Sequence, residues 1–155
     1  MLSSMTVPPR LRPADVGDLP FVLRQGREYI ETIEPDALPG WLAALDRNLE
    51  LWISCLPHTL FCVDGDGQQL GFAMWLPDGG DAATLVSIQV LGSHRRQGLG
   101  RILLDAFEQR VGEGGGRTVK LGVHRSNPAR LLYQAAGYDT SGIDGDYLLF
   151  SKVLR

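Results

Sequence analysis

The segment VSIQVLGSHRRQGLGRILL, residues 86–104, decides the fold and carries the clearest functional signal. Its beginning alternates as a strand does, with Val86, Ile88 and Val90 expected on one face. A turn rich in glycine and arginine follows, and the apolar spacing after it predicts a helix over residues 98–111. The first N–H groups of a helix have no partner inside it and, with the helix dipole, attract anions. The segment therefore predicts an anion site where this helix begins.

Positive charge in the turn supports a phosphate ligand. Arg95, Arg96 and Arg101 lie in or beside it, and arginine pairs with phosphate through two hydrogen bonds. Two common phosphate motifs do not fit this chain. The nearest P-loop match has Val111 where the first glycine belongs, and a dinucleotide fingerprint would have Leu103 at its third glycine. A solvent-exposed basic turn without a ligand is the alternative for this segment taken alone.

The rest of the chain places helices between strands in an order typical of α/β folds. The expected helices cover residues 15–30, 41–54, 98–111 and 127–136, and the expected strands cover residues 11–13, 59–63, 70–76, 84–91, 119–123, 138–141 and 147–153. The sequence DGDG at residues 64–67 predicts a hairpin between the second and third strands. Asn127 and Pro128 are typical of a helix start, and Gly137 is typical of a helix end. The order predicts a layered α/β fold with a mixed sheet.

Length and composition argue against several classes of protein. The 155 residues predict a single domain over residues 1–155. The net charge of −3 argues against non-specific nucleic-acid binding, and no apolar run is long enough to span a membrane. Cys55 and Cys62 stand outside any metal-binding motif, so no metal site is expected. Residues 1–9 lack the apolar core of a secretory signal, so we expect a cytoplasmic protein.

Two linked motifs resemble those of the GNAT superfamily, the acetyl-CoA-dependent N-acyltransferases. Arg95-x-x-Gly98-x-Gly100 matches the signature Q/R-x-x-G-x-G/A of that family. About one strand later, NPARLLYQAAGY at residues 127–138 resembles the family pattern N-x-A-x-x-L-Y-x-x-x-G-F/Y. The resemblance is specific over residues 84–140, and in the N-terminal half it rests on the order of elements alone.

The resemblance implies a GNAT-like fold and acetyl-CoA as cosubstrate. The implied α/β fold has a mixed, mostly antiparallel sheet of about six to seven strands, flanked by about four helices and splayed at the cosubstrate site. Backbone amides of the turn would hold the pyrophosphate, and the strand before it would pair with the pantetheine arm. The amide near Val90 would polarise the thioester carbonyl. The implied contacts are Ile88, Gln89, Val90, Arg95, Arg96, Gln97, Gly98, Leu99, Gly100, Arg101 and Asn127. Asn127 fits equally well as a plain helix cap.

Tyr133 matches the family position whose hydroxyl protonates the departing CoA thiolate. A phenol has a pKa of about 10 and a thiol about 8.5, so a hydrogen bond to sulfur is the alternative to full proton transfer. The glutamate that some relatives use as general base is replaced here by Gly122, and His124 lies two residues further along. The other candidate bases are Glu28, Glu31, His58, Asp81 and Ser87. A water chain to solvent, with no dedicated base, stays open as well.

The acceptor site is expected among the two N-terminal helices and the turn after Leu76. Candidates to line it are the aromatic residues Tyr29, Trp41, Trp52 and Trp75 and the acidic residues Glu28, Glu31, Glu34 and Asp36. The function implied is acetyl transfer to a small-molecule or peptide amine in a ternary complex, and a homodimer is compatible with it. A non-catalytic acyl-CoA-binding regulatory domain is one alternative, and a dinucleotide or nucleic-acid binder using the arginines is another. Neither nucleic acid nor membrane is expected as a partner.

Overall fold

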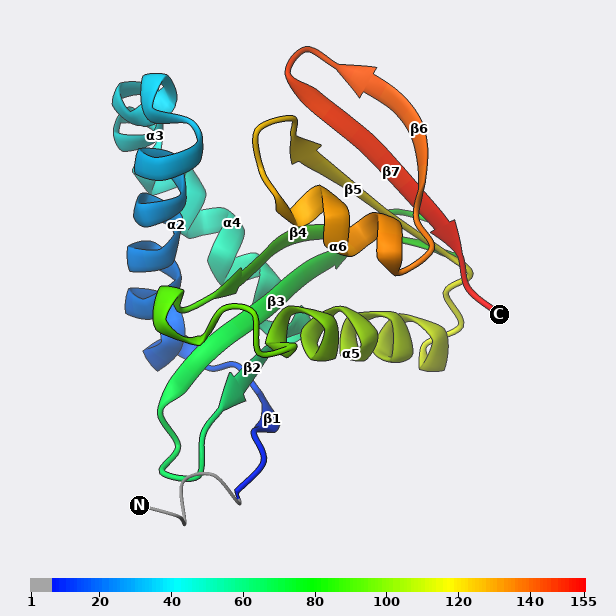
Figure 1. Cartoon of the computed structure of the whole chain (residues 1–155), viewed down its shortest axis with the longest axis horizontal. Helices are drawn as coiled ribbons and strands as arrows, with labels where there is room; N and C mark the ends of the chain where they lie inside the picture. Colours follow the sequence, from blue (N-terminus) through cyan, green and yellow to red (C-terminus); the bar gives the residue numbers. More distant parts are fainter. Residues whose placement is uncertain (1–6) are drawn as a thin grey trace.

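A seven-stranded sheet forms the centre of the molecule (Figure 1). The computed structural model describes residues 7–155. Residues 1–6 of the predicted domain lie outside it, and with them most of residues 1–9, for which no secretory signal is expected. In spatial order the strands are β1 (Arg10–Pro13), β2 (Thr59–Val63), β3 (Gln69–Pro77), β4 (Ala82–Val90), β5 (Thr118–His124), β7 (Tyr147–Val153) and β6 (Asp139–Asp144). Neighbouring strands run antiparallel except for β4 and β5, which run parallel. This confirms the predicted mixed, mostly antiparallel sheet.

Helices cover both faces of the sheet. The α-helices of the described residues are α2 (Leu19–Ile33), α3 (Leu38–Ala43), α4 (Leu45–Cys55), α5 (Leu99–Glu113) and α6 (Ala129–Ala135). Residues of α5 and α6 pack in one apolar core, and residues of α2 and α4 pack in the core on the opposite face. Within residues 7–155, no helix combines the length and hydrophobicity needed to cross a bilayer.

The helix expected over residues 41–54 is instead two helices, which meet at Ala44. The break brings two indoles together. Trp41 and Trp52 are eleven residues apart, which corresponds to about 16 Å along one continuous helix. Their ring centroids lie only 6.4 Å apart, and both rings pack on Gly26 of α2. Because propensity alone does not include this contact with α2, the break could not be predicted from local sequence.

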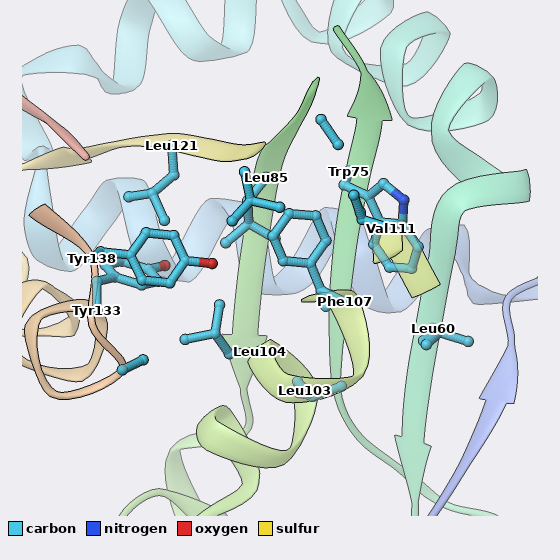
Figure 2. Packing of buried hydrophobic residues seen from close by; sticks show 14 of the residues in the cluster. Leu60, Trp75, Leu85, Leu103, Leu104, Phe107, Val111, Leu121, Tyr133 and Tyr138 are labelled. Atoms are coloured by element: carbon cyan, nitrogen blue, oxygen red, sulfur yellow. The ribbon is translucent and has the colours of Figure 1, made fainter. Parts of the chain in front are cut away.

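The core between α5 and the sheet is closely packed (Figure 2). Leu103, Leu104 and Phe107 of α5 have no exposed surface. The ring of Phe107 lies 5.3 Å from that of Trp75 on β3. This packing fixes the helix against β3 and β4 and so sets the position of its N-terminus.

A buried ion pair joins β1 to the start of α2. Asp18 is 2% exposed and receives two hydrogen bonds from the Arg12 guanidinium, at 2.7 and 2.8 Å. The Gln69 amide and the Asp15 N–H also donate to Asp18, at 2.7 and 2.9 Å. Burial alone would raise the pKa of Asp18, but these hydrogen bonds outweigh it and hold the pKa below its usual range.

Strand β4 contains a β-bulge at Val86. Its register with β3 changes between the pairs Met74–Ser87 and Trp75–Leu85, so Val86 has no partner of its own. The extra residue changes the alternation of side chains. Leu85, Ile88 and Val90 pack on the α5 side, whereas Val86 packs in the opposite core. The prediction that Val86 shares a face with Ile88 and Val90 was therefore wrong, because it assumed a regular strand.

Just before this bulge, β4 and β5 separate (Figure 1). Their parallel pairing begins at Ala82–Thr118 and ends at Thr84–Lys120, although both strands continue. The facing edges of residues 85–90 and 121–124 therefore have no strand partner within the described structure. This confirms the predicted splay, and the open edges offer backbone hydrogen bonds to a ligand.

Candidate functional site

The loop between β4 and α5 has the backbone conformation of an anion site. Arg96 has φ of 64° and Gly98 has φ of 80°, so two residues of this short loop are left-handed. Such turns direct N–H groups toward a common point and form anion-binding nests. Gly98 is also the N-cap of α5, and its helix receives no side-chain cap. The N–H groups and the dipole of a 15-residue helix therefore face the loop.

A pocket of about 440 Å³ opens at this loop. Of the predicted cosubstrate contacts, it is lined by Ile88, Gln89, Val90, Arg95, Arg96, Gly98, Leu99, Gly100 and Asn127. Gln97 and Arg101 are not among its lining residues, and Arg101 instead pairs with Asp105 one turn along α5, at 3.0 Å. The basic residues of the lining are His94, Arg95 and Arg96, and no Asp or Glu within residues 7–155 lines the pocket. The pocket is suited to a ligand with anionic groups.

The Arg95 side chain links this loop to α2. Its Nε donates to the Val90 carbonyl oxygen at 3.2 Å, and a terminal nitrogen donates to Glu28 at 3.0 Å. Both charged groups are about half exposed, so the ion pair contributes little stability. Glu28 is therefore engaged with Arg95 and does not line the pocket.

A second pocket, of about 380 Å³, adjoins the first. The two share the lining residues Tyr29, Ile88, Gln89 and Asn127, so they meet where β4 and β5 separate. The walls of the second pocket include Trp41 from α3, Trp52 from α4 and Tyr133 from α6. Trp75 does not line it, because its ring packs against Phe107 in the α5-side core. Among the described lining residues of the second pocket, Glu34 alone carries a charge.

Tyr133 reaches the second pocket from the α5-side core. It is 5% exposed, and its ring packs edge-on against those of Tyr138 and Phe150, at centroid distances of 5.8 and 6.3 Å. Figure 2 shows Tyr133 and Tyr138 side by side. Burial raises the pKa of Tyr133, so the phenol keeps its proton at neutral pH. The Asn127 side chain accepts the N–H of Ala129, the first residue of α6, at 2.9 Å. The N-cap itself is Pro128, one residue later than the predicted Asn127, and it makes no side-chain cap hydrogen bond.

Of the candidate bases, Ser87 alone lines the second pocket. Gly122 also lines it and supplies no titratable group. His124 packs its ring edge-on against Tyr147, and its Nδ1 accepts the N–H of Ser126 at 3.1 Å. The remaining candidates lie elsewhere: Glu28 pairs with Arg95, Glu31 with Arg27, His58 lies beside Trp75, and Asp81 is in the turn before β4. Within residues 7–155, no cluster of His, Cys, Asp or Glu is arranged to hold a metal ion.

Two residues at the second pocket were not singled out by sequence. In the sequence, Glu34 is only one of four acidic candidates for the acceptor site, with Glu28, Glu31 and Asp36. Tyr147 is only the first residue of the last predicted strand. The available signal for Glu34 was Pro35, because the residue before a proline tends to leave the helical conformation. Glu34 does so, with φ of −131° and ψ of 57°. No local signal placed Tyr147 against it.

Comparison with known proteins identifies the family. Residues 27–138 match the Acetyltransferase (GNAT) family. Mycothiol acetyltransferase from Clavibacter sepedonicus is 34% identical over 120 residues, covering 68% of this chain and 38% of that protein. The ribosomal protein bS18-alanine N-acetyltransferase of Haemophilus influenzae is 36% identical over 67 residues, covering 43% of this chain and 46% of that protein. The chain thus spans less than half the length of each of these curated relatives.

Solved structures share the fold over nearly the whole chain. PaiA N-acetyltransferase from Thermoplasma acidophilum, in complex with coenzyme A, superposes with a TM-score of 0.80 at 18% identity. That alignment covers 95% of this chain and 99% of the other. The family match includes the bulged strand, the left-handed loop and the helix that carries Tyr133. The chain belongs to the acetyltransferase (GNAT) family.

Proposed function

We propose that this protein is an N-acetyltransferase that moves the acetyl group of acetyl-CoA to a primary amine, with both substrates bound together. The observation that carries the proposal is the meeting of two pockets of opposite charge where β4 and β5 separate. The first contains Arg95 and Arg96 and suits a diphosphate. The second contains Glu34 and suits a cationic amine.

The backbone would hold most of the cosubstrate. The N–H groups between Arg95 and Arg101 would bind the pyrophosphate, which explains why the Gln97 and Arg101 side chains need not reach the pocket. The open edge at Ile88–Val90 would pair with the pantetheine arm, and an N–H near Val90 would polarise the thioester carbonyl. Asn127 lines both pockets and would contact the same arm while its side-chain oxygen accepts the N–H of Ala129.

The reaction forms a C–N bond, breaks the C–S bond of the thioester and removes one proton from the attacking nitrogen. The amine nitrogen attacks the carbonyl carbon, the C–S bond breaks, and the CoA sulfur leaves as a thiolate. The amine gives up its proton to water, since Ser87, the one candidate base in the pocket, is a poor proton acceptor. Tyr133 donates a hydrogen bond to the departing sulfur. Because burial raises the pKa of Tyr133, complete proton transfer to the thiolate would be uphill.

The partner proposed is a small-molecule or peptide amine, and the location proposed is the cytoplasm. The two curated relatives carry mycothiol and a ribosomal-protein alanine in their names, so those names do not define one acceptor. Nucleic acid and membrane have no part in the proposal. A homodimer is compatible with the proposal, and sedimentation analysis would detect it.

The test is replacement of Tyr133 by phenylalanine, with Tyr138→Phe as the matched control. Thiol release and mass spectrometry of the amine products would follow turnover on an amine panel. A hydrogen bond to a charged group contributes about 1.5–3 kcal/mol, which corresponds to a loss of roughly 10- to 100-fold in kcat. Tyr138 lines neither pocket, so its variant should keep wild-type kcat.

Several results would contradict the proposal. Full turnover by Tyr133→Phe at every pH would remove its assigned role. Tight CoA binding without acetylation of any amine would favour the non-catalytic regulatory domain. Displacement of CoA by NAD, ATP or RNA would favour the arginine-based nucleotide site.

A further inference from the structure

Glu34 is held at the second pocket by two tyrosines from distant parts of the chain. The hydroxyl of Tyr29, on α2, donates to Glu34 Oε2 at 2.7 Å. The hydroxyl of Tyr147, at the start of β7, donates to the same oxygen at 2.5 Å. Oε1 receives no hydrogen bond from residues 7–155 and remains available to another donor. Both tyrosines line the pocket as well.

Toward Glu34, both tyrosines act as hydrogen-bond donors. Burial, together with the neighbouring Glu34, raises the pKa of Tyr147 to about 12 and also raises that of Tyr29. At neutral pH both phenols keep their protons and donate them in hydrogen bonds to the Glu34 carboxylate. Its position is constrained at one oxygen, which leaves the carboxylate preorganised for a ligand.

The rest of the pocket favours a cation and disfavours an anion. Its walls include the indoles of Trp41 and Trp52, and aromatic faces attract ammonium groups. Its described lining includes no lysine, arginine or histidine. A carboxylate on the acceptor would therefore lie near Glu34 with no positive lining group to compensate it.

We propose that Glu34 selects the acceptor by pairing with its ammonium group, so that the preferred substrates are amines with an aromatic or aliphatic body and no carboxylate beside the nitrogen. This inference rests on the acetyltransferase function proposed above. In this inference Glu34 recognises the acceptor and does not act as the base. The ammonium group gives up its proton before the nitrogen attacks the thioester. The class includes simple amines and the amino ends of peptides, and it excludes free amino acids.

The first test compares matched substrates on three forms of the protein. Phenethylamine and phenylalanine differ by one carboxylate, and rates are compared at equal concentrations of neutral amine. Wild type should show a kcat/KM at least tenfold higher for phenethylamine. Glu34→Gln should raise the KM for phenethylamine about tenfold, with little change in kcat, and should reduce the preference. Glu31→Gln is the control, because Glu31 pairs with Arg27 at 3.2 Å and lines neither pocket.

A second measurement needs no variant and detects binding directly. Phenethyltrimethylammonium carries a permanent charge and cannot be acetylated. It should compete with phenethylamine and should change the fluorescence of Trp41 and Trp52 in the CoA-bound protein. Its uncharged carbon isostere should need at least a tenfold higher concentration to produce the same effects. This arm keeps the inference testable if Glu34→Gln does not fold.

The outcomes separate the two proposals. Acetylation that is equally efficient on phenylalanine and phenethylamine, or that is unchanged in Glu34→Gln, overturns the selection by Glu34 and leaves the acetyltransferase function standing. Equal binding of the cation and its uncharged isostere does the same. Failure to acetylate any amine despite CoA binding overturns the function, and the selection with it.

Discussion

Deletion of Val86 tests whether the bulge in β4 creates the cosubstrate site. Without this residue, Leu85 and Ser87 would become consecutive and would still face Trp75 and Met74 of β3. Side chains beyond the deletion would keep their faces, because the bulge itself supplies the extra step in the alternation. The deletion therefore offers β4 a regular antiparallel path that is compatible with the rest of the sheet.

The expected cost to stability is small. Val86 is only partly buried, and complete burial of a valine contributes about 1.5–3 kcal/mol. Roughly 1 kcal/mol should be lost, and any new pairing between β4 and β5 beyond Thr84 would offset part of it. The effect on the cosubstrate should be larger. Closing the gap removes the strand edge that would pair with pantetheine, and two lost hydrogen bonds at about 0.5–1.5 kcal/mol each correspond to roughly 5- to 100-fold in affinity.

Calorimetric titration with CoA measures this effect, and urea unfolding measures the fold. Val86→Ala is the matched control, because it removes the side chain but keeps the extra residue and so the bulge. Its CoA affinity should stay within about threefold of wild type. A folded deletion variant that binds CoA as tightly as wild type would refute the reasoning, since the gap between β4 and β5 would then not depend on the bulge.

Three further changes probe the loop, the buried ion pair and the core. Gly98→Ala places a Cβ in a left-handed position at a cost of roughly 1–2 kcal/mol and should weaken CoA binding about tenfold. Gly100→Ala, inside α5, would place its Cβ 3.3 Å from a methyl group at the end of the Leu132 side chain and should weaken CoA binding less than threefold in the same calorimetric titration. Asp18→Asn should lower the free energy of unfolding in urea by about 2–3 kcal/mol, because Arg12 loses its ionic partner. Since the folded pKa of Asp18 is below its usual range, this contribution is present above about pH 4 and is lost in the wild type as the pH falls through the folded pKa. Phe107→Ala should lower the free energy of unfolding by about 3–5 kcal/mol, because the ring is fully buried.

Local chemistry made much of the fold predictable. The DGDG turn, the apolar stripe of α5 and the terminal glycine of α6 each depend on residues only a few positions apart, and the hairpin and the two helices that they predict are present. Gly137 has φ of 93°, as a glycine at a helix end requires. The two family motifs likewise depend on short spacings, so the anion loop and Tyr133 could be located from sequence alone.

Features that depend on distant contacts could not be predicted in this way. The break at Ala44 depends on the packing of two indoles against α2, and the bulge at Val86 depends on the register with β3. The contact between Glu34 and Tyr147 joins residues 113 positions apart. Hydrophobic periodicity contains no information about any of these, because it describes one element at a time.

The position of Glu34 at the second pocket bears on the absence of the family's glutamate at Gly122. A side chain at Gly122 would have room, since its Cβ would meet its nearest neighbours, on Leu149 and Tyr147, only at 3.5 and 3.9 Å. Contacts at the Cβ therefore do not require a glycine there. The pocket instead obtains its negative charge from Glu34, at the end of α2, where Pro35 ends the helix and two phenols hold the carboxylate. A charge at that place can orient an ammonium without lying on the strand that faces the thioester. Under the proposed function, recognition of the amine would be separate from removal of its proton, and a sequence search for a single acidic base on the sheet would detect neither.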